Sequence, residues 1–185
     1  KSKIKLGINS KNNYPTLSIL DPKITANSPK NVTLNSSLGA LIRSIDTMFN
    51  KRANKISAMF SENSFKLLFN NLPKVLKQSD NLEYWSNMQW GAYLSIAALL
   101  NSFNGPGAAV AYFLSTNYNI PQGLGYAISG TYFFERNHEK GFYEYSKLFD
   151  LIEKKPSKRK LSKIEKSKFV IRSLVKILKY NKLTL

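Results

Sequence analysis

Apolar side chains recur through the middle of this sequence with the period of an α-helix, which leaves few folds open to it. Between residues 38 and 49 they fall at positions i, i+3, i+4 and i+7, the pattern of a helix with one buried face. These positions are Leu38, Leu41, Ile42, Ile45, Met48 and Phe49. We expect this helix to start at a cap residue, either Asn35 or Ser36.

Further helices follow with the same period. We expect one at 57–70, ended by a break at Pro73, and one at 82–100. The triplet Gly105-Pro106-Gly107 predicts a stop and a new start, because proline suits the first helical position. That helix is expected to reach residue 115, with a loop at 117–123, a helix at 124–135 and one more beyond residue 141. The central part of the chain, residues 28–153, is therefore predicted to be a helical bundle.

The first 27 residues have a different period. Ile4, Leu6 and Ile8 alternate with polar residues, and Leu17 and Ile19 do so again after a turn, so we expect two β-strands. Two strands are not stable alone in water. We therefore assign residues 1–27 to the closing strands of an adjacent α/β domain upstream, and expect the chain to be a segment of a longer polypeptide.

The last part, residues 154–185, is rich in lysine. We expect a solvated basic linker over 154–168 and then a short amphipathic helix with apolar side chains at Ile171, Leu174, Val175 and Leu178. A basic amphipathic helix can lie on an anionic membrane, or its apolar face can dock on its own domain. We favour docking.

The formal net charge is +17, which invites a nucleic acid or an anionic membrane as partner. The chain is also rich in Asn, Ile, Phe and Tyr, a composition that AT-rich coding produces, and arginine is scarce beside lysine. We therefore prefer compositional bias to a dedicated polyanion surface. No apolar run approaches the length of a membrane-spanning helix. No export signal is present, so we expect a cytoplasmic location.

Few side chains are suited to catalysis. Cysteine is absent, and the one histidine, His138, lies in a charged stretch and is expected at the surface. Acidic residues are few, and Asp46, Glu62, Glu83 and Glu135 are all expected on helix surfaces. No glycine-rich phosphate loop and no nucleophile elbow is present. The chain's own side chains therefore predict neither a transition-metal site nor a reactive thiolate.

Several phrases, in shared order, resemble the later portion of the iron-containing (group III) alcohol dehydrogenase family. They are Lys3-Ile4-Lys5-Leu6-Gly7-Ile8, Leu17-Ser18-Ile19-Leu20-Asp21-Pro22, Lys51-Arg52-Ala53-Asn54, Leu72-Pro73-Lys74-Val75 and Asn119-Ile120-Pro121-Gln122-Gly123. The likeness runs from residue 3 to about 150, and beyond 155 we find no correspondence. It implies a mainly α fold, the helical bundle domain of the dehydroquinate synthase-like fold.

The resemblance also implies where a metal would lie. Family enzymes hold Fe²⁺ or Zn²⁺ with one Asp and three His at the cleft between a dinucleotide-binding and a helical domain, where a nicotinamide exchanges hydride. Those four positions fall here on Gly39, Arg43, Ala108 and Gln122, and another family histidine falls on Tyr112. We therefore expect no metal. We also expect no cofactor on this segment alone, with NAD(P) held through an upstream domain or partner chain.

Three functions remain open. The first is a degenerate dehydrogenase domain that acts as a binding or scaffolding module, with Arg43, Gln122, Tyr112 and Tyr126 binding an anionic small molecule. Against this stands the interpretation that Arg43 fills the vacated pocket or pairs with Asp46. The second is an active, metal-independent NAD(P)-dependent oxidoreductase acting on an alcohol or aldehyde. The third is a basic polyanion-binding protein, and a homo-oligomer is open for each.

Overall fold

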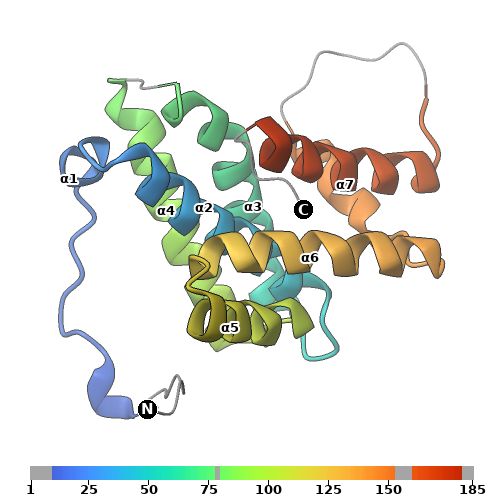
Figure 1. The fold of residues 1–185 in the computed structure, drawn as a ribbon, viewed down its shortest axis with the longest axis horizontal. Coiled ribbons are helices and arrows are strands. Elements are labelled where there is room, and N and C mark those ends of the chain that lie inside the picture. The colour runs from blue at the N-terminus through green and yellow to red at the C-terminus, as the bar shows by residue number, and fades with distance from the viewer. Residues whose placement is uncertain (1–9, 78–79, 153–159, 181–185) are drawn as a thin grey trace.

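The computed structural model describes residues 10–77, 80–152 and 160–180, and these are mostly helical (Figure 1). Along the chain the helices are η1 (Lys11–Asn13), α1 (Pro22–Ala26), α2 (Lys30–Phe49), α3 (Lys55–Val75), α4 (Leu82–Leu100), α5 (Pro106–Tyr118), α6 (Gln122–Glu139), η2 (Glu144–Leu151) and α7 (Lys163–Tyr180). The expected mainly helical bundle is confirmed. No helix among these residues is long and apolar enough to cross a membrane.

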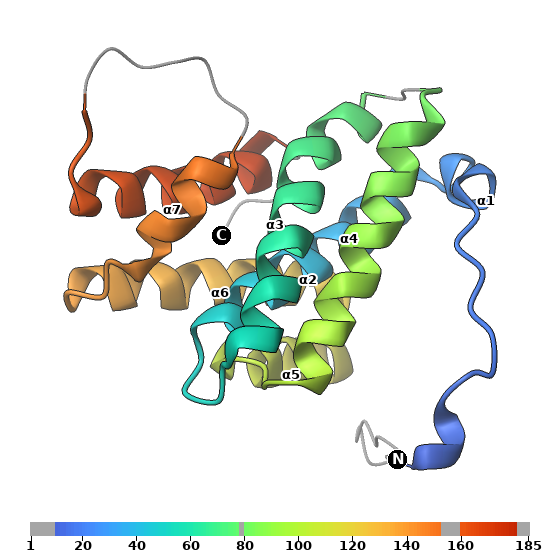
Figure 2. The ribbon, with the colours of Figure 1, turned by 180° about the vertical axis from the view of Figure 1, so that it is seen from behind.

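Helix α2 crosses the centre of the molecule, between α6 on one side and the α3–α4 pair on the other (Figures 1 and 2). Its predicted apolar positions Leu38, Leu41, Ile42, Ile45 and Met48 are all buried. The helix starts earlier than expected, at Lys30, because Pro29 already has the backbone conformation of a cap residue. Asn35 and Ser36 therefore lie inside the helix and do not cap it.

Helices α3 and α4 pack against each other along their length. The bounds expected for α4 are confirmed, but α3 continues through Pro73 to Val75. A proline removes one hydrogen bond, and in the last turn of a helix this is tolerated. Gly91 of α4 lies directly on Leu68 of α3, and its carbonyl accepts a 2.7 Å hydrogen bond from Ser64 Oγ.

Helices α5 and α6 form a hairpin. Pro106 is the first residue of α5, as predicted, and Asn119 ends that helix in the left-handed conformation (φ 55°). Helix α6 is longer than expected at both ends, from Gln122 to Glu139. The segment beyond residue 141 is a 3-10 helix, η2, where an α-helix was expected.

Helix α7 docks on the bundle by its apolar face. This confirms the expectation that it packs on its own domain. Val170, Ile171, Leu174 and Leu178 join the main core, and the helix packs against η2 and α6. It begins within the stretch expected to be a linker. The amide of Glu165 donates to Ser162 Oγ at 3.2 Å, and the Glu165 carboxylate accepts from the Ser162 amide at 2.9 Å. This reciprocal capping pair starts the helix at Lys163.

No strand occurs in the described part of the N-terminal segment. The first expected strand, at Ile4, Leu6 and Ile8, lies outside the described residues. The second, around Leu17 and Ile19, is irregular, and these side chains are 75% and 79% exposed. A strand forms only beside a partner strand, and the segment runs apart from the helices along one side of the bundle (Figure 1).

Candidate functional site

Four of the candidate residues from the sequence meet at one pocket between α2 and α6. Gly39 and Arg43 come from α2, and Gln122 and Tyr126 come from α6. Together with Asn35, Ser36 and Gly123 they line a pocket of about 320 Å³. Residues four apart on a helix share a face, which places Gly39 and Arg43 one turn apart on the same wall.

Two glycines bring the walls of this pocket together. A Cβ atom added to Gly39 would lie 3.2 Å from the Cα of Gly123, and one added to Gly123 would collide with the backbone oxygen of Asn35. The α2 and α6 backbones therefore touch beside the pocket. Any side chain at position 123 would push the two helices apart and change the position of Arg43 relative to Tyr126.

The guanidinium of Arg43 has few partners in the protein. Its Nη1 donates a 3.3 Å hydrogen bond to Ser95 Oγ, and its Nε is buried without a partner among the described residues. Burial lowers the pKa of Arg43, because a low-dielectric environment disfavours the charged form. No ion pair joins it to Asp46 in the described part of the chain. The interpretation that Arg43 pairs with Asp46 is therefore wrong.

Asp46 was expected on a helix surface, and that prediction is wrong. Its Oδ2 accepts a 2.6 Å hydrogen bond from the Tyr126 hydroxyl and a 3.1 Å hydrogen bond from the Gly105 amide. Burial raises the pKa of Asp46 to about 6, against these two hydrogen bonds, which lower it. The pKa of Tyr126 is raised, mainly by burial and to a smaller extent by the nearby Asp46. The sequence named Asp46 only as an alternative partner of Arg43, three residues away on the same helix, and did not predict its contacts with Tyr126 and Gly105.

Two further expected residues lie outside this pocket. Ala108, at the start of α5, is buried and does not line it. Tyr112, one turn further along α5, is 42% exposed but close enough to influence the pKa of both Arg43 and Tyr126. His138 is also elsewhere. It is half-buried rather than fully at the surface, and its Nδ1 is 2.9 Å from Ser167 Oγ of α7.

The residues of this cleft do not fit a divalent metal. A stable zinc or iron site needs at least three side-chain donors around the ion. Of Gly39, Arg43, Ala108 and Gln122, only Gln122 offers a side-chain oxygen, and Arg43 is a cation that repels a metal. Within the described ranges, no group of three or more His, Cys, Asp or Glu side chains is close enough to hold a metal.

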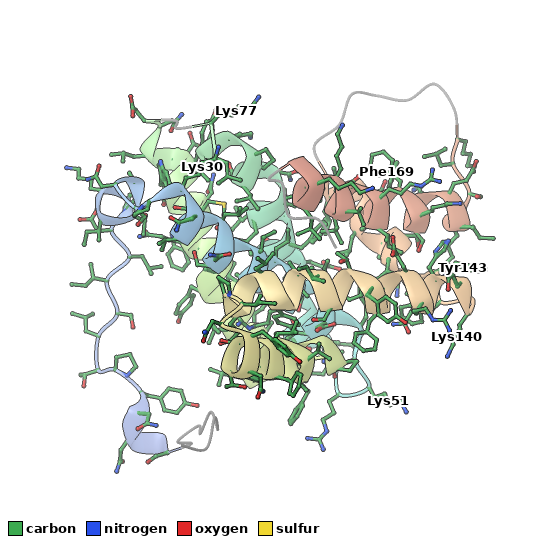
Figure 3. All side chains as sticks on the ribbon, in the orientation of Figure 1. Lys30, Lys51, Lys77, Lys140, Tyr143 and Phe169 are labelled. Atoms are coloured by element: carbon green, nitrogen blue, oxygen red, sulfur yellow. The ribbon has the colours of Figure 1, made fainter. Side chains whose placement is uncertain are left out.

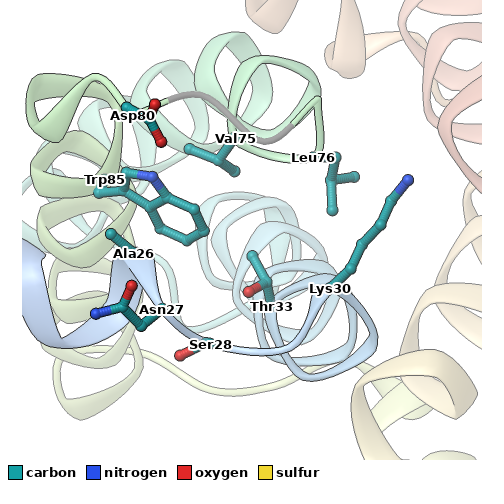
Figure 4. Close-up of a pocket in the computed structure, with 9 residues that line it drawn as sticks. All are labelled: Ala26, Asn27, Ser28, Lys30, Thr33, Val75, Leu76, Asp80 and Trp85. Carbon is teal, nitrogen blue, oxygen red and sulfur yellow. The ribbon is translucent and has the colours of Figure 1, made fainter.

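A separate pocket of about 230 Å³ lies where the α1–α2 turn meets the ends of α3 and α4 (Figure 4). Trp85 forms one wall, and Lys30 and Asp80 stand at its rim. Thr33 Oγ1 is buried there without a partner among the described residues, and one bound water would satisfy it. None of the residues that the resemblance brings to the cleft lines this pocket, so we take the α2–α6 pocket as the candidate site.

The sequence of the chain is similar to those of alcohol dehydrogenases. The model of the Fe-containing alcohol dehydrogenase family, C-terminal, matches residues 33–182. A 1,3-propanediol dehydrogenase of Citrobacter freundii is 28% identical over 128 residues, which cover 69% of this chain and 33% of that protein. A 4-hydroxybutyrate dehydrogenase of Clostridium kluyveri is 26% identical over 138 residues, covering 74% of this chain and 37% of the relative. The chain thus spans about a third of the length of these relatives.

Solved structures share the fold. An archaeal alcohol dehydrogenase from a Red Sea brine pool superimposes with a TM-score of 0.85 over 99% of this chain and 46% of its own, at 18% identity. A 1,3-propanediol oxidoreductase superimposes with a TM-score of 0.79 over 89% of this chain and 42% of its own, at 19% identity. Because the family match extends to residue 182, the expectation that the likeness ends near residue 150 is wrong.

Proposed function

The chain belongs to the Fe-containing alcohol dehydrogenase family, as its C-terminal helical part, and we propose that it is a degenerate domain in which an anionic small molecule takes the place of the metal. In this proposal it is a binding or scaffolding module rather than a metal-dependent dehydrogenase. The ligand lies between α2 and α6, against Arg43, Gln122 and Tyr126.

The unpartnered Nε of Arg43 is the observation that carries this proposal. Burying a charged hydrogen-bond donor without an acceptor costs more free energy than burying a neutral one. We therefore infer that a bound ligand supplies the missing acceptor for Arg43 Nε. Guanidinium binds carboxylate and phosphate in a planar, two-bonded geometry. The nearby carboxylate of Asp46 already accepts two hydrogen bonds, which leaves Arg43 free for a ligand.

The size of the pocket and the chemistry of relatives support a small carboxylate. A pocket of about 320 Å³ is at the lower end of the range for small-molecule sites. The Clostridium kluyveri relative is named for 4-hydroxybutyrate, which is itself a carboxylate. The Gln122 side-chain amide, on the opposite wall from Arg43, can donate to a second ligand oxygen.

Titration calorimetry tests the proposal with malonate, succinate and phosphate, and with neutral 1,3-propanediol as a control ligand. We expect the anions to bind and the diol not to bind. Arg43→Met keeps most of the side-chain length and removes the charge, so it should weaken anion binding about tenfold or more, equivalent to at least roughly 1.4 kcal/mol. Arg52→Met is the matched control, because Arg52 lies outside the pocket, over the Phe103 ring.

The outcomes of that titration separate clearly. Equal losses in Arg43→Met and Arg52→Met would mean that overall charge, and not the pocket, attracts the anion. Binding that survives Arg43→Met unchanged would refute the proposal. Arg43→Lys is expected to recover only part of the affinity, since an ammonium cannot form the two parallel hydrogen bonds of a guanidinium.

A second candidate is an active, metal-independent oxidoreductase on an alcohol or aldehyde. The hydrogen bond between Tyr126 and Asp46 favours it, since two proton-carrying groups lie beside the pocket. This function needs NAD(P), bound through an upstream domain or partner chain. Turnover by the intact protein that persists in the presence of a chelator, and is lost in Tyr126→Phe, would support this candidate.

A further inference from the structure

We propose that α7 presents a binding surface for the phosphodiester backbone of nucleic acid, formed by Lys168, Arg172, Lys176 and Lys179. These four side chains, called here the cationic row, are all exposed. With 3.6 residues per turn they lie within roughly 80° of one another around the helix axis. This surface is separate from the pocket at Arg43 and does not depend on the function proposed for it.

The way α7 docks is what exposes the row. Its apolar side chains Val170, Ile171 and Leu174 are buried in the main core, on the side of the helix turned away from the row. Lys163 and Lys166, on the flank of α7, are paired with Glu144 and Asp150. The fold thus neutralises the lysines beside η2 and leaves those of the row facing solvent.

Among the residues that the structure describes, no acidic side chain is paired with a member of the row. Glu135 of α6 is the acidic residue that shares a shallow groove with Arg172, Lys176 and Lys179. Three cations around one carboxylate keep a net positive potential, and like charges this close repel one another unless a polyanion lies over them.

Compositional bias does not account for this charge, since bias would spread lysine evenly along the chain. Twelve of the 28 Lys and Arg residues lie between Lys154 and Lys182, where Glu165 is the one acidic residue. The preference for bias over a dedicated surface rested on the overall composition, with its excess of lysine over arginine and its many Asn, Ile, Phe and Tyr residues. The distribution of that charge, and the face of α7 that carries it, favour a surface that binds polyanions.

A nucleic acid suits this row better than a membrane does. Successive members are three or four residues apart, so the charges follow one another every 5–6 Å, roughly, along about 16 Å of helix. A regular line of cations matches the regular line of phosphates on a nucleic-acid strand. A helix that lies on a membrane inserts its apolar face, and in α7 that face is already buried in the bundle. Two large apolar side chains of α7 lie next to the row. Ile164 is 49% exposed, and Phe169, labelled in Figure 3, packs edge-on against Phe149 of η2.

Fluorescence anisotropy with a short labelled DNA duplex of random sequence tests the proposal on the full chain. The row variant carries Lys168→Gln, Arg172→Gln, Lys176→Gln and Lys179→Gln. The control variant carries Lys23→Gln, Lys51→Gln, Lys55→Gln and Lys66→Gln, which removes the same charge at exposed positions outside α7. Lys51 lies well away from α7 (Figure 3).

We expect the wild-type chain to bind the duplex with a steep salt dependence. The row variant should bind about tenfold or more weakly, and the slope of log K against log salt should fall by about 3 to 4, one phosphate for each lost cation. The control variant and Arg43→Met should stay within about threefold of wild type. Should the row variant lose helical circular dichroism, the two half-variants at 168/172 and 176/179 replace it, each with an expected slope change of about 2.

Three results would overturn this proposal. The first is no duplex binding by the wild-type chain at low salt. The second is an equal loss in the row and control variants, which would show attraction by net charge alone. The third is tighter binding to phosphatidylcholine–phosphatidylserine vesicles than to the duplex at the same salt concentration, which would make a lipid surface the partner.

Discussion

Arg43 and Asp46 are three residues apart on α2 and have opposite charges, yet they do not pair. Asp46 is held by Tyr126 and by the backbone of Gly105, which begins the turn into α5. Tyr126 therefore has two roles, since it lines the pocket and its hydroxyl donates a hydrogen bond to the Asp46 carboxylate. Among the described residues, the Arg43 guanidinium has one side-chain hydrogen-bond partner, Ser95, and for this reason we assign Arg43 to a ligand.

The buried carboxylate makes stability depend on pH in a predictable direction. The pKa of Asp46 is raised from 3.8 to about 6 in the folded chain. Between those values the folded state keeps a proton that the unfolded state has released, so the free energy of unfolding falls as pH rises through this window. Above about pH 6 the contribution is constant.

Asp46→Asn removes this dependence while keeping an oxygen that accepts from Tyr126 and Gly105. We expect its unfolding free energy, relative to wild type, to rise by roughly 3 kcal/mol between about pH 4 and pH 7. Urea unfolding at several pH values measures it. Asp80→Asn, at an exposed position, is the control and should stay parallel to wild type. A constant difference between Asp46→Asn and wild type would show that Asp46 does not titrate in this window.

Most residues of the pocket were predictable from the sequence, but the buried environment of the neighbouring Asp46 was not. The resemblance brought Gly39, Arg43 and Gln122 together, and the structure places all three on one pocket. Asp46 was misplaced because an amphipathic helix was assumed to have a solvent face. Helix α2 packs against α3, α4 and α6, and from Ser37 to Phe49 none of its residues is exposed, so a polar residue in that stretch has no surface to occupy. Only tertiary contacts could reveal the partners of Asp46.

At the scale of elements, the close contact of α3 and α4 depends on Gly91. A Cβ atom there would lie 2.7 Å from Leu68 Cγ, closer than side-chain atoms tolerate. The Leu68 side chain packs against the glycine, whose buried carbonyl oxygen accepts a hydrogen bond from Ser64. Gly91 and Ala98 of α4 are both buried, and their small size suits the close packing of this helix.

Gly91→Ala should therefore destabilise the bundle by about 1–3 kcal/mol through overpacking. Leu68→Ala alone should cost about 2–5 kcal/mol by leaving a cavity. Together the two changes should cost less than their sum, because the new methyl group enters the space that Leu68 leaves.

Gly125→Ala on α6 is the matched control. Its Cβ would meet neighbours at 3.4 Å or more, so it should be neutral or stabilising. Chemical denaturation of the four variants measures all of these, and strictly additive costs would contradict the packing described here.

Helix existence was predictable, and helix ends were not. The 3.6-residue period found each long helix, whereas several of the expected ends were displaced, three of them by identifiable local chemistry. Pro29 starts α2 early, Pro73 is absorbed in the last turn of α3, and the Ser162–Glu165 pair starts α7 inside a lysine-rich stretch. Each of these depends on a backbone conformation that periodicity does not report.

At the scale of the whole molecule, the chain is a helical domain with two separate polar surfaces. The pocket lies between α2 and α6, and the cationic row lies on α7. The chain covers 46% of the length of the archaeal alcohol dehydrogenase whose fold it shares.

The central claim is that this pocket has exchanged a metal for an anion. A crystal of the chain soaked in zinc sulfate, with anomalous data collected at the zinc edge, tests it directly. We predict sulfate density against Arg43 and no anomalous peak between α2 and α6. A zinc peak coordinated among Gly39, Arg43, Ala108 and Gln122 would contradict the account.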